Sequence, residues 1–222
     1  MYICDIYDSE LKNLCQRFSN NDKPEFTDQE VKTIYLNVMN VEQRLQIKQL
    51  HRFANDYFRS WFPLLPSYEA FNMRVNRLSE AFKQLSGTLL SEYCPTDCQS
   101  DISLVDSLPI ITCLGKRANA VPKELTDKGY CSTKSMYYYG SKLHALAFRR
   151  PSHLPFPESL IITPASENDL NVQKQFWIEA LFNWSIEKTD IQRASTMRSS
   201  KRLIVHIFGR IAVAYVFLIF NS

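Results

Sequence analysis

Residues 102–111, ISLVDSLPII, mark the point at which the sequence changes character. The run is β-branched and aliphatic, has the length of a strand and carries one charged residue, Asp106. Two similar runs follow, MYYYGSKLHALAF at 136–148 and SLIITPAS at 159–166, so we expect three strands. An unpaired carboxylate in an apolar strand costs several kcal/mol to bury. Asp106 is therefore the first candidate site residue, although Ser107 and nearby lysines at the strand end would also satisfy it.

Before this point the apolar residues recur at helical spacing, from residue 28 to residue 90. Thr27 and Glu30 have the spacing of a capping box and predict a helix start. Ser67 predicts a second start, with a helix running to about residue 90. We expect residues 1–100 to form a unit of three or four helices that ends in the polar turn SEYCPTDCQS.

Helical spacing returns after the strands. Ser166 and Asp169 are typical of a helix start, and residues 170–188 continue that helix. The last run, LIVHIFGRIAVAYVFLIF, has 18 residues at 203–220. A membrane span needs about 20 apolar residues, and a central arginine costs about 2.5–3.5 kcal/mol on insertion scales. A buried core helix is favoured over a membrane segment, and the whole pattern predicts an α+β protein.

Composition excludes several classes of protein. The chain has 222 residues, of which 45% are apolar and 22% are charged, as in globular domains and unlike disordered or collagen-like chains. The net charge is only +3, but residues 101–150 carry eight basic and four acidic side chains.

The N-terminus lacks a signal peptide pattern. Six scattered cysteines indicate a reduced, cytoplasmic protein, and Cys94 and Cys98 have no second ligand pair for zinc.

Basic residues alternate with tyrosines between residues 115 and 142. Such a pattern suits a nucleic acid, because the cations bind phosphates and the rings stack on exposed bases. The alternative is a solvated loop followed by a strand whose tyrosines face the core. The sequence leaves both interpretations open.

Several stretches resemble DDE-type transposases of bacterial insertion sequences. These are DSLPI at 106–110, TDKGYCSTKSMYYYGSKLHALAF at 126–148, PESLIITPASENDL at 157–170 and IEALFNWSIEKTDIQRAS at 178–195. WFPLLPSYEAFNMRVNRL at 61–78 is similar to the helical N-terminal region of the same family. The resemblance follows the family's order over most of residues 25–222.

The resemblance implies that residues 101–222 form a partial RNase H-like domain. In the family, three carboxylates hold two Mg²⁺ ions that drive DNA cleavage and strand transfer. Asp106 matches the first of them and Glu179 matches the last, so both are expected catalytic and metal-binding residues. The implied partner is terminal-repeat DNA. The resemblance also implies a homo-oligomer of this chain or a mixed oligomer with full-length transposase. The expected DNA-binding residues are Lys116, Arg117, Lys134, Lys142, Lys188, Arg193 and Arg198.

The chain departs from the family between Asp169 and Glu179. The family has a further strand there with the second catalytic Asp, but only nine residues separate the two positions in this chain. A crossover back from a strand needs more, so we expect an internal deletion near 175–178. Asp169 is a weak substitute ligand, since ten positions on one helix span about 15 Å. We expect a catalytically impaired transposase. The alternatives are a non-catalytic DNA-binding inhibitor of the full-length enzyme and, less favoured, a small membrane-associated protein.

Overall fold

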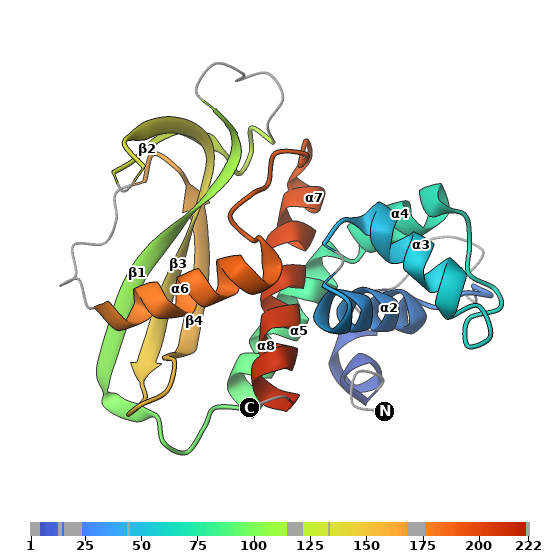
Figure 1. Ribbon diagram of the computed structural model, residues 1–222, viewed down its shortest axis with the longest axis horizontal. Helices are drawn as coiled ribbons and strands as arrows, with labels where there is room; N and C mark the ends of the chain where they lie inside the picture. Colours follow the sequence, from blue (N-terminus) through green and yellow to red (C-terminus); the bar gives the residue numbers. More distant parts are fainter. Residues whose placement is uncertain are drawn as a thin grey trace.

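The computed structural model describes residues 5–12, 15, 24–43, 45–114, 122–132, 134–167 and 176–220. For residues 9, 100, 102, 103, 176–179 and 220 it describes the backbone alone. Within this part of the chain, helices pack around an antiparallel sheet (Figure 1). The expected α+β class is confirmed at that level.

The N-terminal half is helical. Thr27 begins α2 with both bonds of the capping box, Thr27 N–H to Glu30 Oε2 at 2.6 Å and Glu30 N–H to Thr27 Oγ1 at 3.2 Å. Ser67 caps the start of α4 with a single bond, from Ala70 N–H to Ser67 Oγ at 3.4 Å. Both predicted helix starts are confirmed, but the helix expected from Ser67 onward divides at Leu78. The elements are η1 (Tyr7–Leu11), α2 (Asp28–Val41), α3 (Ile47–Tyr57), α4 (Tyr68–Arg77) and α5 (Ser79–Glu92).

The sheet is organised around its third strand. On one edge β3 pairs with β1, and on the other edge it pairs with β2 near its start and with β4 along the rest. All these pairings are antiparallel. The strands are β1 (Gln99–Leu114), β2 (Asp127–Cys131), β3 (Met136–Arg149) and β4 (Phe156–Pro164). The sequence analysis predicted three of them and missed β2.

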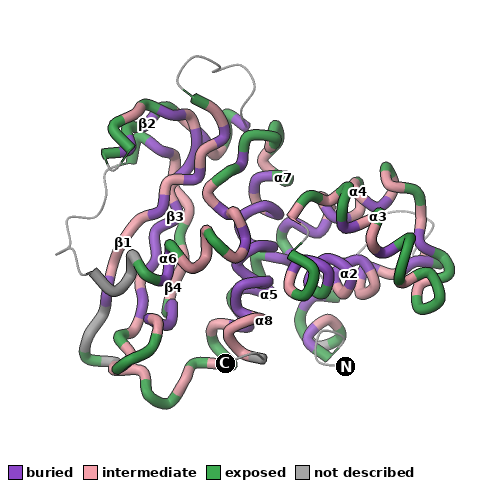
Figure 2. The backbone as a smooth tube through the Cα atoms, in the orientation of Figure 1, coloured by how far each residue is buried: buried purple, intermediate pink, exposed green. Residues whose placement is uncertain are grey.

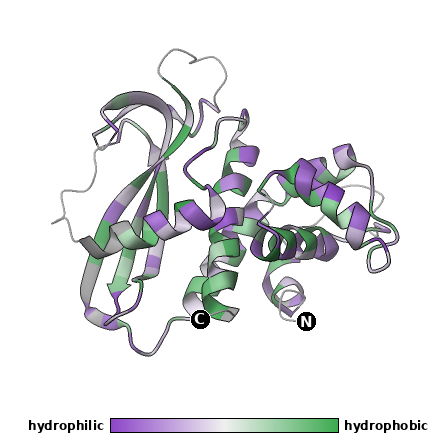
Figure 3. Ribbon diagram, viewed as in Figure 1, coloured by the Kyte–Doolittle hydropathy of each residue, from purple (hydrophilic) through white to green (hydrophobic). Residues whose placement is uncertain are grey.

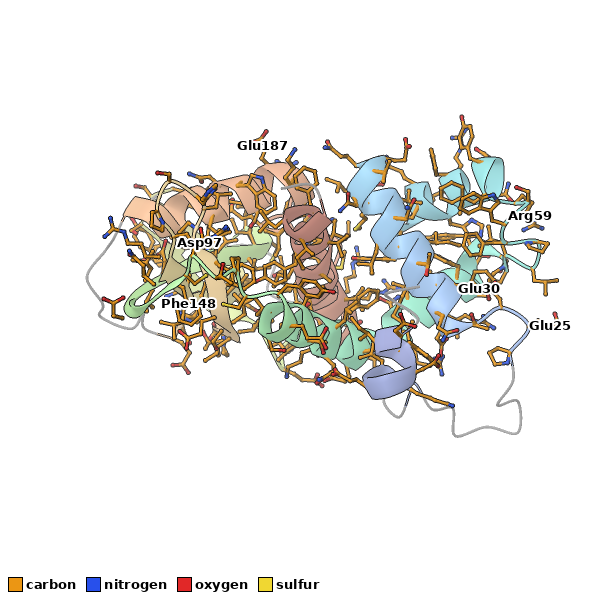
Figure 4. All side chains as sticks on the ribbon, turned by 90° about the horizontal axis from the view of Figure 1, so that it is seen from below. Glu25, Glu30, Arg59, Asp97, Phe148 and Glu187 are labelled. Carbon is orange, nitrogen blue, oxygen red and sulfur yellow. The ribbon has the colours of Figure 1, made fainter. Side chains whose placement is uncertain are left out.

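One face of the sheet carries the core. Leu104, Leu108 and Ile110 alternate along β1, and Leu108 lies opposite Leu143 of β3. The helix α6 (Phe176–Thr189) crosses this face (Figure 1). Glu187 points away from the body of the protein on the outer side of α6 (Figure 4), so the opposite side of the helix meets the sheet.

The C-terminal helix lies between the sheet and the N-terminal helices (Figure 1). It consists of α7 (Ser200–Ile204), the π-helical turn η3 (Val205–Gly209) and α8 (Arg210–Phe220). It packs against α2 and α5 on one side and against α6 on the other. These contacts cross the boundary expected near residue 100 and join both halves in a single hydrophobic core.

The same helix is the membrane candidate of the sequence analysis. Ser200–Ile219 has 20 residues and contains an 18-residue window with a mean hydropathy of 1.9, enough by length and composition to cross a membrane. However, 67% of that window is buried inside the protein. Figure 2 shows the helix as mostly buried, and Figure 3 shows hydrophobic colouring along much of α8. This burial accounts for the apolar sequence and is typical of a soluble protein. A cytoplasmic location stays a prediction.

Two polar side chains of this helix are held inside the core. Arg210 is only 6% exposed, and its guanidinium donates to the carbonyls of Thr189 and of Leu45, the latter at 3.0 Å. Thr189 ends α6, where the helix dipole favours a cation. The Nε2–H of His206 donates to the carbonyl of Ile191 at 2.9 Å. The buried charge is therefore bound by carbonyls at a helix end and in the α2–α3 connection.

We expect Gly209→Ala to destabilise the protein. A Cβ at this position would lie 2.6 Å from the hydroxyl of Tyr35, a side chain that is itself 1% exposed and has no room to move. Overpacking of this kind costs about 1–3 kcal/mol. The matched control is Gly87→Ala in α5, where nothing lies within 4 Å and alanine should add about 0.5–1 kcal/mol. Urea unfolding measures both, and equal stabilisation by the two changes would refute the tight contact.

We also expect the free energy of unfolding to decrease in mild acid because of His206. Burial, with the nearby charge of Arg210, lowers the pKa of His206 to about 3. The unfolded chain therefore binds the proton first, so the free energy of unfolding is undiminished above about pH 6.5 and decreases as the pH falls from there towards 3. His206→Gln should flatten this slope by up to about 1.4 kcal/mol per pH unit. His153→Gln, at an exposed position, should leave it unchanged, and Tm measured across this range decides between the two.

Candidate functional site

A hollow of about 500 Å³ lies at the outer edge of β1. The edge of β1, one side of α6 and the β2–β3 hairpin surround it. It is the place in the fold where Asp106 and two of the predicted cations lie together. The lining residues that matter below are Asp106, Pro109, Tyr130, Lys134, Lys142, Phe182 and Gln192.

No described strand pairs with this edge of β1, but its backbone groups between residues 107 and 111 are protected in other ways. Ile111 donates to the carbonyl of Gln192 at 2.8 Å and accepts from Ala194 at 2.9 Å, which forms a short parallel bridge. Alternate residues of a strand direct their groups to the same side, so Pro109 and Ser107 also face this edge. Pro109 has no N–H, and the N–H of Ser107 donates to Asp106 Oδ1 at 2.7 Å. The edge is thus protected between residues 107 and 111 without a neighbouring strand.

Asp106 lies on the face of the sheet that α6 covers. It is half-buried and lies opposite Ala145, which is 1% exposed. Its carboxylate accepts from the backbone N–H of Ser107, in line with the alternative that Ser107 satisfies this charge at the strand end. Asp106 is therefore a residue of the hollow that also stabilises the strand edge.

The other two expected carboxylates lie beyond what the structure describes. Glu179 is in α6, one turn before Phe182 of the hollow, and its side chain is outside the described atoms. Asp169 and the junction up to residue 175 lie outside the described residues. The convergence of Asp106 with Glu179, and the continuous helix from 169 to 179, stay predictions.

The described donors do not fit a two-magnesium site. Mg²⁺ requires several hard oxygen ligands in an octahedron. Of the described side chains around the hollow, Asp106 alone is a carboxylate, and Lys134 and Lys142 lie with it. In the described part of the chain no three His, Cys, Asp or Glu side chains gather as metal ligands. We therefore derive no chemical step through a metal.

Two lysines are among the residues that line the hollow. Lys134 donates to the amide oxygen of Gln192, and Lys142 donates to the carbonyl of Glu167 at 2.7 Å. The acceptors of these two bonds are an amide oxygen and a backbone carbonyl oxygen. Ammonium groups attract phosphates, which carry a full negative charge.

The other predicted cations that the structure describes do not line this hollow. Arg193 lines a second hollow of about 650 Å³ between the N-terminal helices and the C-terminal helix, together with Lys48 and Arg202. Lys188 lies 4.8 Å from the ring of Phe217, and Arg198 is exposed. The expected DNA-binding residues therefore divide between two surfaces. Lys116 and Arg117 lie outside the described residues.

The tyrosines of the basic segment separate into two kinds. Tyr138 is fully buried with Cys131 and Ala165, whereas Tyr130 and Tyr137 are exposed. The core-facing interpretation is confirmed for Tyr138, and the nucleic-acid interpretation stays a prediction. Alternation along β3 was visible in the sequence, but the exposed pair depends on β2, which was not predicted.

No protein-family model, curated protein or solved structure matches this chain. Membership of the transposase family therefore stays a proposal.

Proposed function

We propose that this chain is a DNA-binding protein derived from a DDE transposase domain and impaired in Mg²⁺-dependent cleavage. The observation that carries the proposal is the composition of the hollow at the edge of β1. Asp106, which the resemblance matches to the first catalytic carboxylate, lines the hollow together with Lys134 and Lys142. Among the described lining residues there are two lysines and one carboxylate, a composition that favours phosphate binding over metal binding.

The order of the elements supports the transposase descent. β1, β3 and β4 form an antiparallel set in which the opening strand bears Asp106. A late helix, α6, carries the motif of Glu179 and packs across that strand. The resemblance implies the first carboxylate on an opening strand and the last on a late helix, and this order of elements supports the proposal. The parallel bridge of Arg193 to Ile111 lies at the edge of β1 where a further strand is absent from the described chain.

We expect DNA binding to be electrostatic and to depend on the lysines of the hollow. The double change Lys134→Gln and Lys142→Gln should weaken binding to all sequences alike and reduce the slope of log K against log salt by about 0.7–0.9 per lost phosphate contact. Lys116→Ala with Arg117→Ala should act in the same direction. Fluorescence anisotropy at several salt concentrations measures this.

The matched control for this experiment is Lys83→Gln, which removes one exposed lysine from α5, away from the hollow. It should leave the salt slope unchanged. Affinity that does not change between about 50 and 200 mM salt would exclude an electrostatic interface.

We expect no Mg²⁺-dependent cleavage or strand transfer of DNA by the purified protein. The charge of a phosphoryl transition state needs both ions of a two-metal site, and the described donors do not fit that site. Incubation with labelled DNA and Mg²⁺, with and without Asp106→Ala, provides the measurement. Strong cutting that Asp106→Ala abolishes would show that another carboxylate completes the site.

A further inference from the structure

We propose that Tyr130 and Tyr137 form a stacking site for unpaired nucleobases at the rim of the hollow, so that this surface takes a single strand in preference to a duplex. The inference rests on the proposed DNA-binding function and specifies the form of nucleic acid that is bound. It is carried by the geometry of the β2–β3 hairpin.

The two rings form an exposed pair on one face of the hairpin. Tyr130 of β2 lies directly opposite Tyr137 of β3, and their ring centroids are 5.0 Å apart. Tyr130 is 51% exposed and Tyr137 is 60% exposed. Large aromatic side chains exposed to this extent leave ring surface free for a ligand.

The opposite face of the hairpin is packed, which fixes the direction of the tyrosines. A Cβ at Gly129 would overlap the backbone of Ala165, so the two segments are in close contact there. Cys131 and Tyr138 are buried on the same side. Because side chains alternate along a strand, Tyr130 and Tyr137 face away from this contact.

Cations lie beside the rings at positions suited to phosphates. The ammonium group of Lys128 lies 4.9 Å from the centroid of the Tyr137 ring. Tyr130 and Lys134 line the hollow together. Stacking rings next to a positively charged groove are the arrangement that binds single strands without sequence preference.

A duplex would use this surface poorly. Paired bases are stacked on one another, so their faces are not free to contact a tyrosine ring, whereas each unpaired base exposes its π-face. A cross-strand tyrosine pair also stabilises a hairpin by itself. The experiment therefore has to separate base stacking from both phosphate binding and hairpin stability.

The test compares three labelled probes of equal length by fluorescence anisotropy. They are a thymine single strand, an abasic strand with the same number of phosphates, and a duplex. The wild-type protein should bind the thymine strand at least about 10-fold more tightly than the abasic strand. Equal affinity for these two probes overturns the stacking site while leaving phosphate binding, and so the proposed function, in place. Absence of binding to all three probes overturns both.

Variants then assign the effect to the two rings. Tyr130→Leu with Tyr137→Leu should reduce binding of the thymine strand to the abasic level, and Tyr130→Phe with Tyr137→Phe should retain the preference. The control Tyr57→Leu changes a tyrosine at the end of α3 that is 69% exposed, and it should have no effect. Loss of the preference in the phenylalanine variant would contradict stacking. The probe comparison uses the wild-type protein, so its outcome does not depend on whether the variants fold.

Discussion

The fold depends on the way in which the guanidinium of Arg210 is bound inside the core. A cation in the middle of an apolar helix is expensive to bury unless its donors are satisfied. Here the carbonyls of Thr189 and Leu45 accept from it. One of them ends α6 beside the sheet and the other belongs to the N-terminal helical region. A single side chain of the C-terminal helix therefore connects the two parts that this helix separates.

The site follows from this arrangement. Because Thr189 and Ile191 are bound by Arg210 and His206, the chain leaving α6 passes close to the sheet, and residues 192–194 reach the edge of β1. The same constraint orients α6 so that Phe182 lines the hollow. The hollow is thus held open by packed elements on all its described sides.

Local signals in the sequence predicted the elements that depend on nearby residues. The caps at Thr27 and Ser67, the long apolar strands and the core character of the C-terminal run are of this kind. The strand β2 was missed because DKGYC is short, charged and contains glycine, and its pairing with β3 creates it. The division of the tyrosines, and the separation of Arg193 from Lys134, likewise depend on register and packing that no local pattern encodes.

Hydrogen exchange of residues 200–220 in detergent-free buffer tests the central claim most directly, since the whole account requires this helix to be the core of a soluble protein. We expect its amides to be among the most protected in the chain and to exchange together with those of α5 and β3, with no change when lipid vesicles are added. Rapid exchange in water, with protection appearing only when vesicles are present, would contradict the account and identify the helix as a membrane segment.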